Sequence, residues 1–170
     1  MRGFMDRTQT ERREEFALRD GPWLFADTAG AVPMAGWWRD GRWEAFVRAE
    51  GVQALEGFFA TVEAVLRETN ARLEEARGVV FVEGPGSILG IRVAAMALRA
   101  WRTLPGLASW TVAGAGTLTL AGHLLRRERP ELADFSLLAD SRQGRWNVAV
   151  VRGGNVPEGF VEKRAEELAE

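Results

Sequence analysis

The residues of this chain with the clearest chemical potential form a Gly-Pro-Gly-Ser turn at 84–87. The run Val79 to Val82 before it predicts a buried strand, because β-branched and aromatic residues suit a covered, pleated surface. Gly84 and Gly86 permit backbone conformations and close approaches that a Cβ would block. Ser87 is a good N-cap for a following helix, whose first N–H groups would then point outward at the turn. A strand, a glycine turn and a helix N-terminus together are suited to hold an anion.

The same turn also has a purely structural interpretation, since many strand-to-helix connections use a glycine and a serine cap only to turn the chain. Its spacing does not fit the dinucleotide-binding fingerprint, because Leu89 stands three positions after Gly86 and the next glycine is Gly90. No Gly-Lys-Ser/Thr follows, as a P-loop would require. The sequence therefore supports neither a Rossmann enzyme nor a P-loop NTPase.

Composition narrows the function classes further. The 170 residues carry a net charge of −2, which argues against nucleic acid held by bulk electrostatics, and no direct nucleic-acid contact is expected. The absence of cysteine excludes disulfides and thiolate chemistry, and the single histidine, His123, excludes a histidine-clustered zinc site. Residues 1–20 are strongly charged and lack an apolar core, so they predict a flexible extension rather than a signal peptide or membrane span. A cytoplasmic protein is expected.

The spacing of apolar residues predicts the strands and helices around the turn. Three apolar segments, 23–26, 32–38 and 43–48, predict antiparallel strands, with Asp40-Gly41 as a strong hairpin signal. Trp37 and Trp38 are adjacent, so in a strand they face opposite sides. The rest of the chain predicts helices at 55–66, 87–101, 116–127 and 161–169, and strands at 79–82, 109–112, 135–139 and 146–151.

The helix expected at 87–101 has almost no polar face. Arg92 and Arg99, seven residues apart and hence on one face, are its only charges. A helix that is apolar on both sides is buried on both sides, so one side is expected to pack on the sheet and the other on a partner chain. The partner interface predicted on this helix and the one before it comprises Phe58, Phe59, Val62, Arg92, Met96 and Arg99.

The predicted order, β-β-β-α-β-α-β-α, defines an α/β fold class. It matches the ribonuclease H-like unit, which is also one lobe of the actin-like ATPase fold. We expect a charged extension at 1–20, an actin-like N-terminal lobe at 21–130, and a truncated second lobe, a hairpin plus a helix, at 131–170. In such a lobe the acid after the first strand and the later glycine turn lie on one edge of the sheet.

Four stretches in this order resemble the TsaB (YeaZ) family of bacterial proteins. The most specific is Gly84-Pro85-Gly86-Ser87-Ile88-Leu89-Gly90-Ile91-Arg92, which is similar to the family's Gly-Pro-Gly-Ser-Phe-Thr-Gly-Leu-Arg signature. The others are Phe25-Ala26-Asp27-Thr28, the alanine-rich helix after the signature, and Leu138-Ala139-Asp140-Ser141-Arg142. Leu89 and Ala29 stand where the family has hydroxyl residues, and the chain is shorter than family members.

The resemblance implies a non-catalytic scaffold in the synthesis of the tRNA modification threonylcarbamoyladenosine. Such a protein acts as a homodimer or with a partner of the actin-like fold similar to TsaD, which carries the transferase activity. No cofactor is implied with certainty, although ATP or ADP bound weakly is compatible with the turn. The residues expected around such a nucleotide or anion are Asp27, Thr28, Gly84, Gly86, Ser87, Gly90 and Asp140.

Two alternatives to the interaction protein remain open at this point. In the first, Asp27, Glu83 and Asp140 gather at one sheet edge and hold magnesium for phosphoryl transfer or nuclease chemistry. Asp27-Thr28 is equally well explained as a turn-forming pair. In the second, backbone amides from Gly86 to Leu89 bind a nucleotide phosphate without catalysis.

Overall fold

A five-stranded mixed sheet forms the centre of the larger part of the molecule. The structure is a computed structural model that describes residues 21–168, so the predicted extension at 1–20 lies outside the described residues. The strand order is β3-β2-β1-β4-β5, with β1 antiparallel to β2 and parallel to β4. The strands are β1 (Trp23–Asp27), β2 (Met34–Arg39), β3 (Arg42–Arg48), β4 (Gly78–Gly84) and β5 (Thr111–Gly116).

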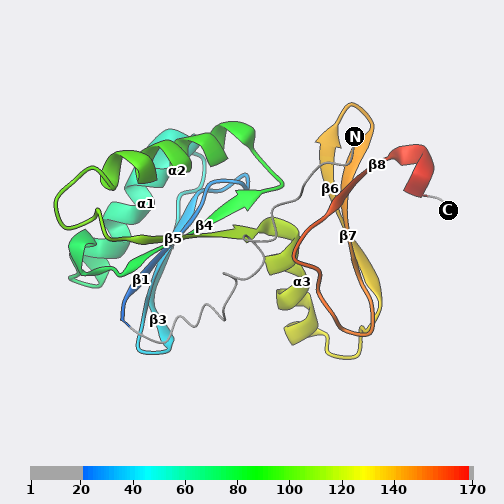
Figure 1. Ribbon diagram of the computed structural model, residues 1–170, viewed down its shortest axis with the longest axis horizontal. Helices are drawn as coiled ribbons and strands as arrows, with labels where there is room; N and C mark the ends of the chain where they lie inside the picture. Colours follow the sequence, from blue (N-terminus) through cyan, green and yellow to red (C-terminus); the bar gives the residue numbers. More distant parts are fainter. Residues whose placement is uncertain (1–20, 169–170) are drawn as a thin grey trace, which may run out of the picture.

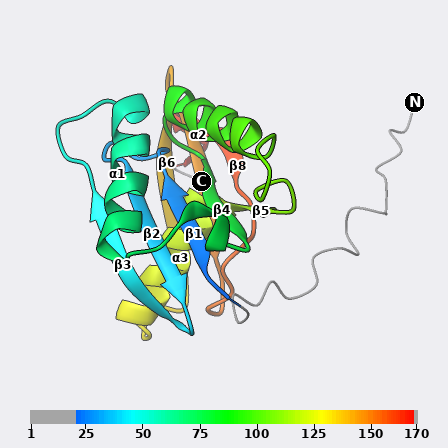
Figure 2. The same cartoon turned by 90° about the vertical axis from the view of Figure 1, so that its left-hand side faces the viewer.

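Two helices lie side by side on one face of this sheet, α1 (Ala54–Glu68) and α2 (Ile88–Trp101) (Figures 1 and 2). The helix α3 (Thr117–Glu128) leads from β5 to a second, antiparallel sheet (Figure 1). No helix within residues 21–168 is long and apolar enough to cross a membrane. The second sheet has the order β6-β7-β8, with β6 (Phe135–Arg142), β7 (Arg145–Val151) and β8 (Val161–Arg164).

Alternation along the strands divides apolar side chains between the two faces of the large sheet. Trp37 is fully buried in the main core, whereas Trp38 faces the other side and meets Trp43 edge to face at 5.2 Å. This confirms the opposite orientation predicted for the tryptophan pair. The Asp40-Gly41 hairpin is also confirmed, with both residues at positive φ as a tight two-residue turn requires. The main core beneath α1 and α2 includes Leu24, Trp37, Phe58, Val65, Val79 and Leu98.

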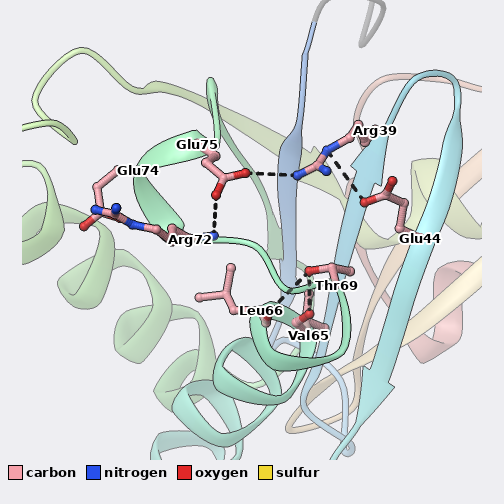
Figure 3. A network of polar contacts seen from close by, with 8 residues as sticks. All are labelled: Arg39, Glu44, Val65, Leu66, Thr69, Arg72, Glu74 and Glu75. Carbon is pink, nitrogen blue, oxygen red and sulfur yellow. Dashed lines mark hydrogen bonds and ion pairs between the residues drawn. The ribbon is translucent and has the colours of Figure 1, made fainter.

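An arginine ties the hairpin to the segment that leads into β4 (Figure 3). The guanidinium of Arg39 on β2 donates to Glu75 at 3.2 Å and lies 3.7 Å from Glu44 on β3. Glu75 closes the 3₁₀ turn Leu73–Glu75 by accepting the backbone N–H of Arg72 at 3.0 Å. Exposed ion pairs of this kind contribute little energy each, so the network mainly orders the chain before β4.

Two elements differ from the sequence prediction. Residues 161–164 were predicted as helix but form β8, paired with β7, and only Ala165–Leu168 is helical, as a 3₁₀ turn. The strand predicted at 109–112 is β5, which runs instead from Thr111 to Gly116. Its second half is alanine and glycine, which have low strand propensity. The carboxylate of Glu83 lies against Gly114, in the space that a Cβ would occupy.

Candidate functional site

The glycine turn packs directly on the end of β1. The Ser87 N–H donates to the carbonyl oxygen of Ala29 at 2.7 Å, and a Cβ on Gly86 would overlap that same carbonyl. Ser87 is the N-cap of α2, and its side chain accepts the Gly90 N–H at 3.2 Å, as predicted. The turn is thus held in place by a backbone approach that only glycine allows.

A second close approach lies one helical turn further on. Gly90 is buried, and a Cβ there would overlap the carbonyl oxygen of Thr28. The Thr28 hydroxyl is also buried and donates to the Gly90 carbonyl oxygen at 2.7 Å. Thr28, Ala29, Gly86 and Gly90 therefore form a closed contact between β1 and the start of α2, which we call the seam.

The Asp27 carboxylate stabilises the β1 side of the seam. Its Oδ1 accepts the backbone N–H groups of Ala29 at 2.8 Å and Gly30 at 3.3 Å. This is the turn-forming arrangement that Asp commonly provides after a strand. In this structure Asp27 holds backbone donors of its own loop.

Beside the seam, a cleft of about 530 Å³ separates the glycine turn from the β6–β7 hairpin. Of the predicted nucleotide or anion residues, Gly86, Ser87 and Asp140 line this cleft together. Asp27, Thr28, Gly84 and Gly90 do not line it. Thr28, Gly84 and Gly90 are buried in the contacts that position the turn.

The opposite wall of the cleft is built at the β6–β7 turn. Oδ1 of Asp140 accepts the backbone N–H of Arg142 at 2.7 Å, and Arg142 has a positive φ of 67°. The Ser141 hydroxyl donates to Glu162 on β8 at 2.7 Å, and Arg145 donates to the other carboxylate oxygen. The Ser141 hydroxyl and the Arg145 guanidinium lower the pKa of the Glu162 carboxyl group. These contacts hold the turn that faces α2.

Sequence reasoning missed several residues of the cleft. Ser141, Arg142 and Asn147 line its second wall, and Arg92, predicted only as an interface residue, lines the first. A signal for Asn147 was available, because it is a polar residue in the apolar run 146–151. Asn147 pairs with Ala139 of β6 and lines the cleft.

The three acids proposed for magnesium do not form a site. Asp27 accepts amides of its own loop, the Glu83 carboxylate lies against Gly114 of β5, and Asp140 accepts the Arg142 N–H. Within residues 21–168 no group of three or more histidine, cysteine, aspartate or glutamate side chains is placed to hold a metal ion. The geometry does not favour the metal-dependent enzyme.

A different surface is exposed on the side of α1 and α2 that faces away from the sheet. Ile88 and Met96 on α2 are 74% and 67% exposed. Together with these two, the exposed large apolar residues of the helices are Leu55, Phe59 and Leu89, and we call the set the outer face. Exposed apolar residues gathered on one surface commonly mark an interaction site.

The predicted interface residues divide between this outer face and the core. Phe59, Arg92, Met96 and Arg99 are exposed. Phe58 and Val62 are buried, and Phe58 stacks on Trp101 with ring centroids 5.4 Å apart. Phe58 and Val62 lie on the side of α1 that packs in the main core.

Comparison with solved structures identifies the fold. YeaZ from Pseudomonas aeruginosa superposes with a TM-score of 0.69 at 18% identity, over 85% of this chain and 66% of that one. A second structure, of an uncharacterized protein with similarity to peptidase YeaZ from Pseudomonas aeruginosa, gives 0.67 at 18% identity over 84% and 65%. Component A of the (R)-2-hydroxyglutaryl-CoA dehydratase of Acidaminococcus fermentans gives 0.50 at 14% identity over 85% and 48%. No family profile matches the sequence, and no curated protein does.

The chain therefore has a fold like that of YeaZ, in the actin-like ATPase fold class. It spans 66% and 65% of the lengths of the two YeaZ-like structures. Its second sheet of three strands carries the wall of the cleft that faces the glycine turn.

Proposed function

We propose that this protein is a non-catalytic interaction protein of the TsaB type, which associates through the outer face of α1 and α2. The association is with a second copy of the chain or with a partner of the actin-like fold similar to TsaD. The exposure of Met96 and Ile88 in a helix that otherwise packs on the sheet carries this proposal. The YeaZ-like fold supports it.

The chemistry of the outer face favours a protein partner. Leu55, Phe59 and Met96 offer apolar contact area, and the exposed Arg99 adds a charge on α2. Interfaces between proteins commonly have an apolar centre in which aromatic residues, methionine and arginine are enriched. A phosphoryl-transfer enzyme is not favoured, because its three acids are engaged separately.

The experiment is an affinity capture of the tagged chain from lysate of its source cells, with light scattering of the purified protein alongside. Met96→Glu is the interface variant, since a carboxylate buried without a partner is costly. Leu124→Glu on α3 is the matched control, because Leu124 is also exposed but lies off the outer face. We expect wild type and Leu124→Glu to capture a TsaD-like protein, identified by mass spectrometry, or to form a dimer. If Met96→Glu still captures the partner and still forms the dimer as wild type does, the outer face is not the interaction surface.

The modification role needs a separate measurement. If the protein supports synthesis of threonylcarbamoyladenosine, tRNA from cells lacking its gene will contain less of that nucleoside, and wild type but not Met96→Glu will restore it. Unchanged tRNA would reject this role while leaving the interaction surface to be judged by capture and light scattering.

A further inference from the structure

A cluster of aromatic rings lies on the face of the large sheet opposite α1 and α2. Its members are Phe25 of β1, Trp38 of β2, and Trp43 and Phe46 of β3, and we call the set the aromatic face. The Trp43 ring contacts the other three rings, with centroids 5.2 to 5.8 Å away. The rings of Phe46 and Trp43 also lie over Gly36, where a Cβ would meet them at 2.7 Å and 2.8 Å. The cluster is therefore packed on the sheet and within itself.

Half of the aromatic face remains exposed. The side chains of Trp43 and Phe46 are 46% and 47% exposed. The helices α1 and α2 cover the other side of the sheet (Figures 1 and 2), and α3 contacts it at β4 and β5, beyond β1 from β3. Large apolar side chains that are gathered in one exposed patch commonly mark a surface that takes part in an interaction.

The segment that precedes β1 is long enough to cover this patch. Residues 1–20 include two large apolar side chains near their end, Phe16 and Leu18. These stand seven and five positions before Trp23, so an extended chain carries them up to about 24 Å and 17 Å from it. The aromatic face runs from β1 across β2 to β3, two strand spacings or about 10 Å. Both side chains can therefore reach every ring of the cluster.

The chain also enters the sheet next to the aromatic face. Trp23, the first residue of β1, pairs with Trp38 of β2. It faces the same side of the sheet as Phe25, because alternate residues of a strand point the same way. Just before it, Gly21 has a positive φ of 90°, a conformation that glycine adopts readily and that bends the chain. The preceding residues can therefore leave the line of β1 and cross its neighbours.

We propose that Phe16 and Leu18 pack on the aromatic face of their own chain and cover Trp43 and Phe46. Tethering favours this occupant over a second copy, because a short linker holds a segment at an effective concentration of roughly millimolar. A charged terminal segment forms no core by itself, but two apolar side chains can tie it to a cluster that already exists. The proposal is independent of the proposed function, which concerns the outer face on the other side of the sheet.

The test is paramagnetic NMR of the full chain, which contains no cysteine and therefore takes a single spin label through Glu15→Cys. We expect the label to broaden the backbone amide signals of Gly36 and Phe46, and to leave that of Met96 on the outer face sharp. Broadening of Met96 equal to that of Phe46, or no broadening in β3, overturns the proposal. A mixture of spin-labelled chain and isotope-labelled chain without the spin label distinguishes a second copy. Broadening of Gly36 and Phe46 in that mixture also overturns it.

Phe16→Ser combined with Leu18→Ser tests the two apolar side chains in the spin-labelled protein. Their loss should lower the population of the docked state by about tenfold or more, and the broadening at Phe46 should decrease accordingly. Glu11→Ser combined with Arg12→Ser is the matched control, because it changes two residues of the same segment without changing the net charge. The amide spectrum shows that each variant folds. Broadening that persists in the first variant, or that is lost equally in the control, overturns the proposal.

Discussion

The two sides of helix α2 are packed in opposite ways. At the seam, Gly86 and Gly90 lie so close to Ala29 and Thr28 that neither position has space for a Cβ. On the outer face, Met96 is 67% exposed. The Gly-Pro-Gly-Ser motif is therefore used to bring backbones together, and the exposed side of the same helix remains available for contact.

This contrast changes the interpretation of a glycine-rich signature. Glycines in such a turn suggest a ligand that approaches the backbone, yet here the approaching group at Gly86 and Gly90 is the protein's own carbonyl oxygen.

The largest effect is expected from breaking the seam with Gly90→Ala. In a helix this change normally adds close to 1 kcal/mol of stability. Here the methyl group overlaps the Thr28 carbonyl, so we expect a net loss of about 2–3 kcal/mol in the free energy of unfolding. Urea unfolding measures it, with Gly159→Ala as control because a Cβ there meets nothing. A Gly90→Ala protein as stable as wild type would mean that the seam is looser than described.

The next effect is expected on association rather than on stability. Met96→Glu should leave the free energy of unfolding of the monomer within about 0.5 kcal/mol, because the side chain is exposed. It should at the same time abolish self-association or partner capture. Unfolding of a dilute sample and light scattering of a concentrated one separate the two quantities. A large stability loss in the dilute sample would place Met96 in the core.

A smaller change, Thr28→Val, tests the hydrogen bond of the seam without altering its shape. It removes the buried hydroxyl that donates to the Gly90 carbonyl oxygen, so we expect a loss of about 0.5–1.5 kcal/mol in the free energy of unfolding. Thr103→Val is the control, since the Thr103 hydroxyl bonds its own helix end on the surface. Equal losses in the two variants would contradict a special role for the buried bond.

The smallest effect is expected at Glu162, on the second sheet. The Ser141 hydroxyl and the Arg145 guanidinium lower the pKa of its carboxyl group from an ordinary 4.5. A lowered pKa in the folded state stabilises the protein above the unfolded pKa, and this stabilisation is lost as the pH falls through the lowered value. The decrease in melting temperature as the pH falls below 4.5 should therefore be slightly smaller in Glu162→Gln than in wild type. If the melting temperature of both proteins falls identically with pH, the Glu162 carboxylate does not contribute to stability in this way.

Much of the large sheet was predictable because its signals are local. The Asp40-Gly41 turn, the Ser87 cap and the alternation around Trp37 each depend on a few neighbouring residues. β8 was missed because the charged segment 161–164 is extended only through pairing with β7, which is distant in sequence. The ends of β5 were misplaced because its alanines and glycines give no strand signal.

The candidate site was only partly predictable for the same reason. Gly86, Ser87 and Asp140 were expected together and line one cleft. Thr28 was expected to touch a ligand, and only the fold shows that its hydroxyl is used by Gly90. Phe58 and Phe59 are adjacent in sequence, and the packing of α1 on the sheet decides which of them is buried.

The most direct measurement of the central claim is sedimentation equilibrium of the wild-type chain and of Met96→Glu over the same concentration range, with Leu124→Glu as control. We predict that wild type and Leu124→Glu either approach twice the mass of the chain by themselves or form a complex when a TsaD-like protein is added. Met96→Glu is predicted to remain monomeric with and without that protein. Equal association by Met96→Glu and wild type, or a wild-type chain that stays monomeric with and without that partner, would contradict it.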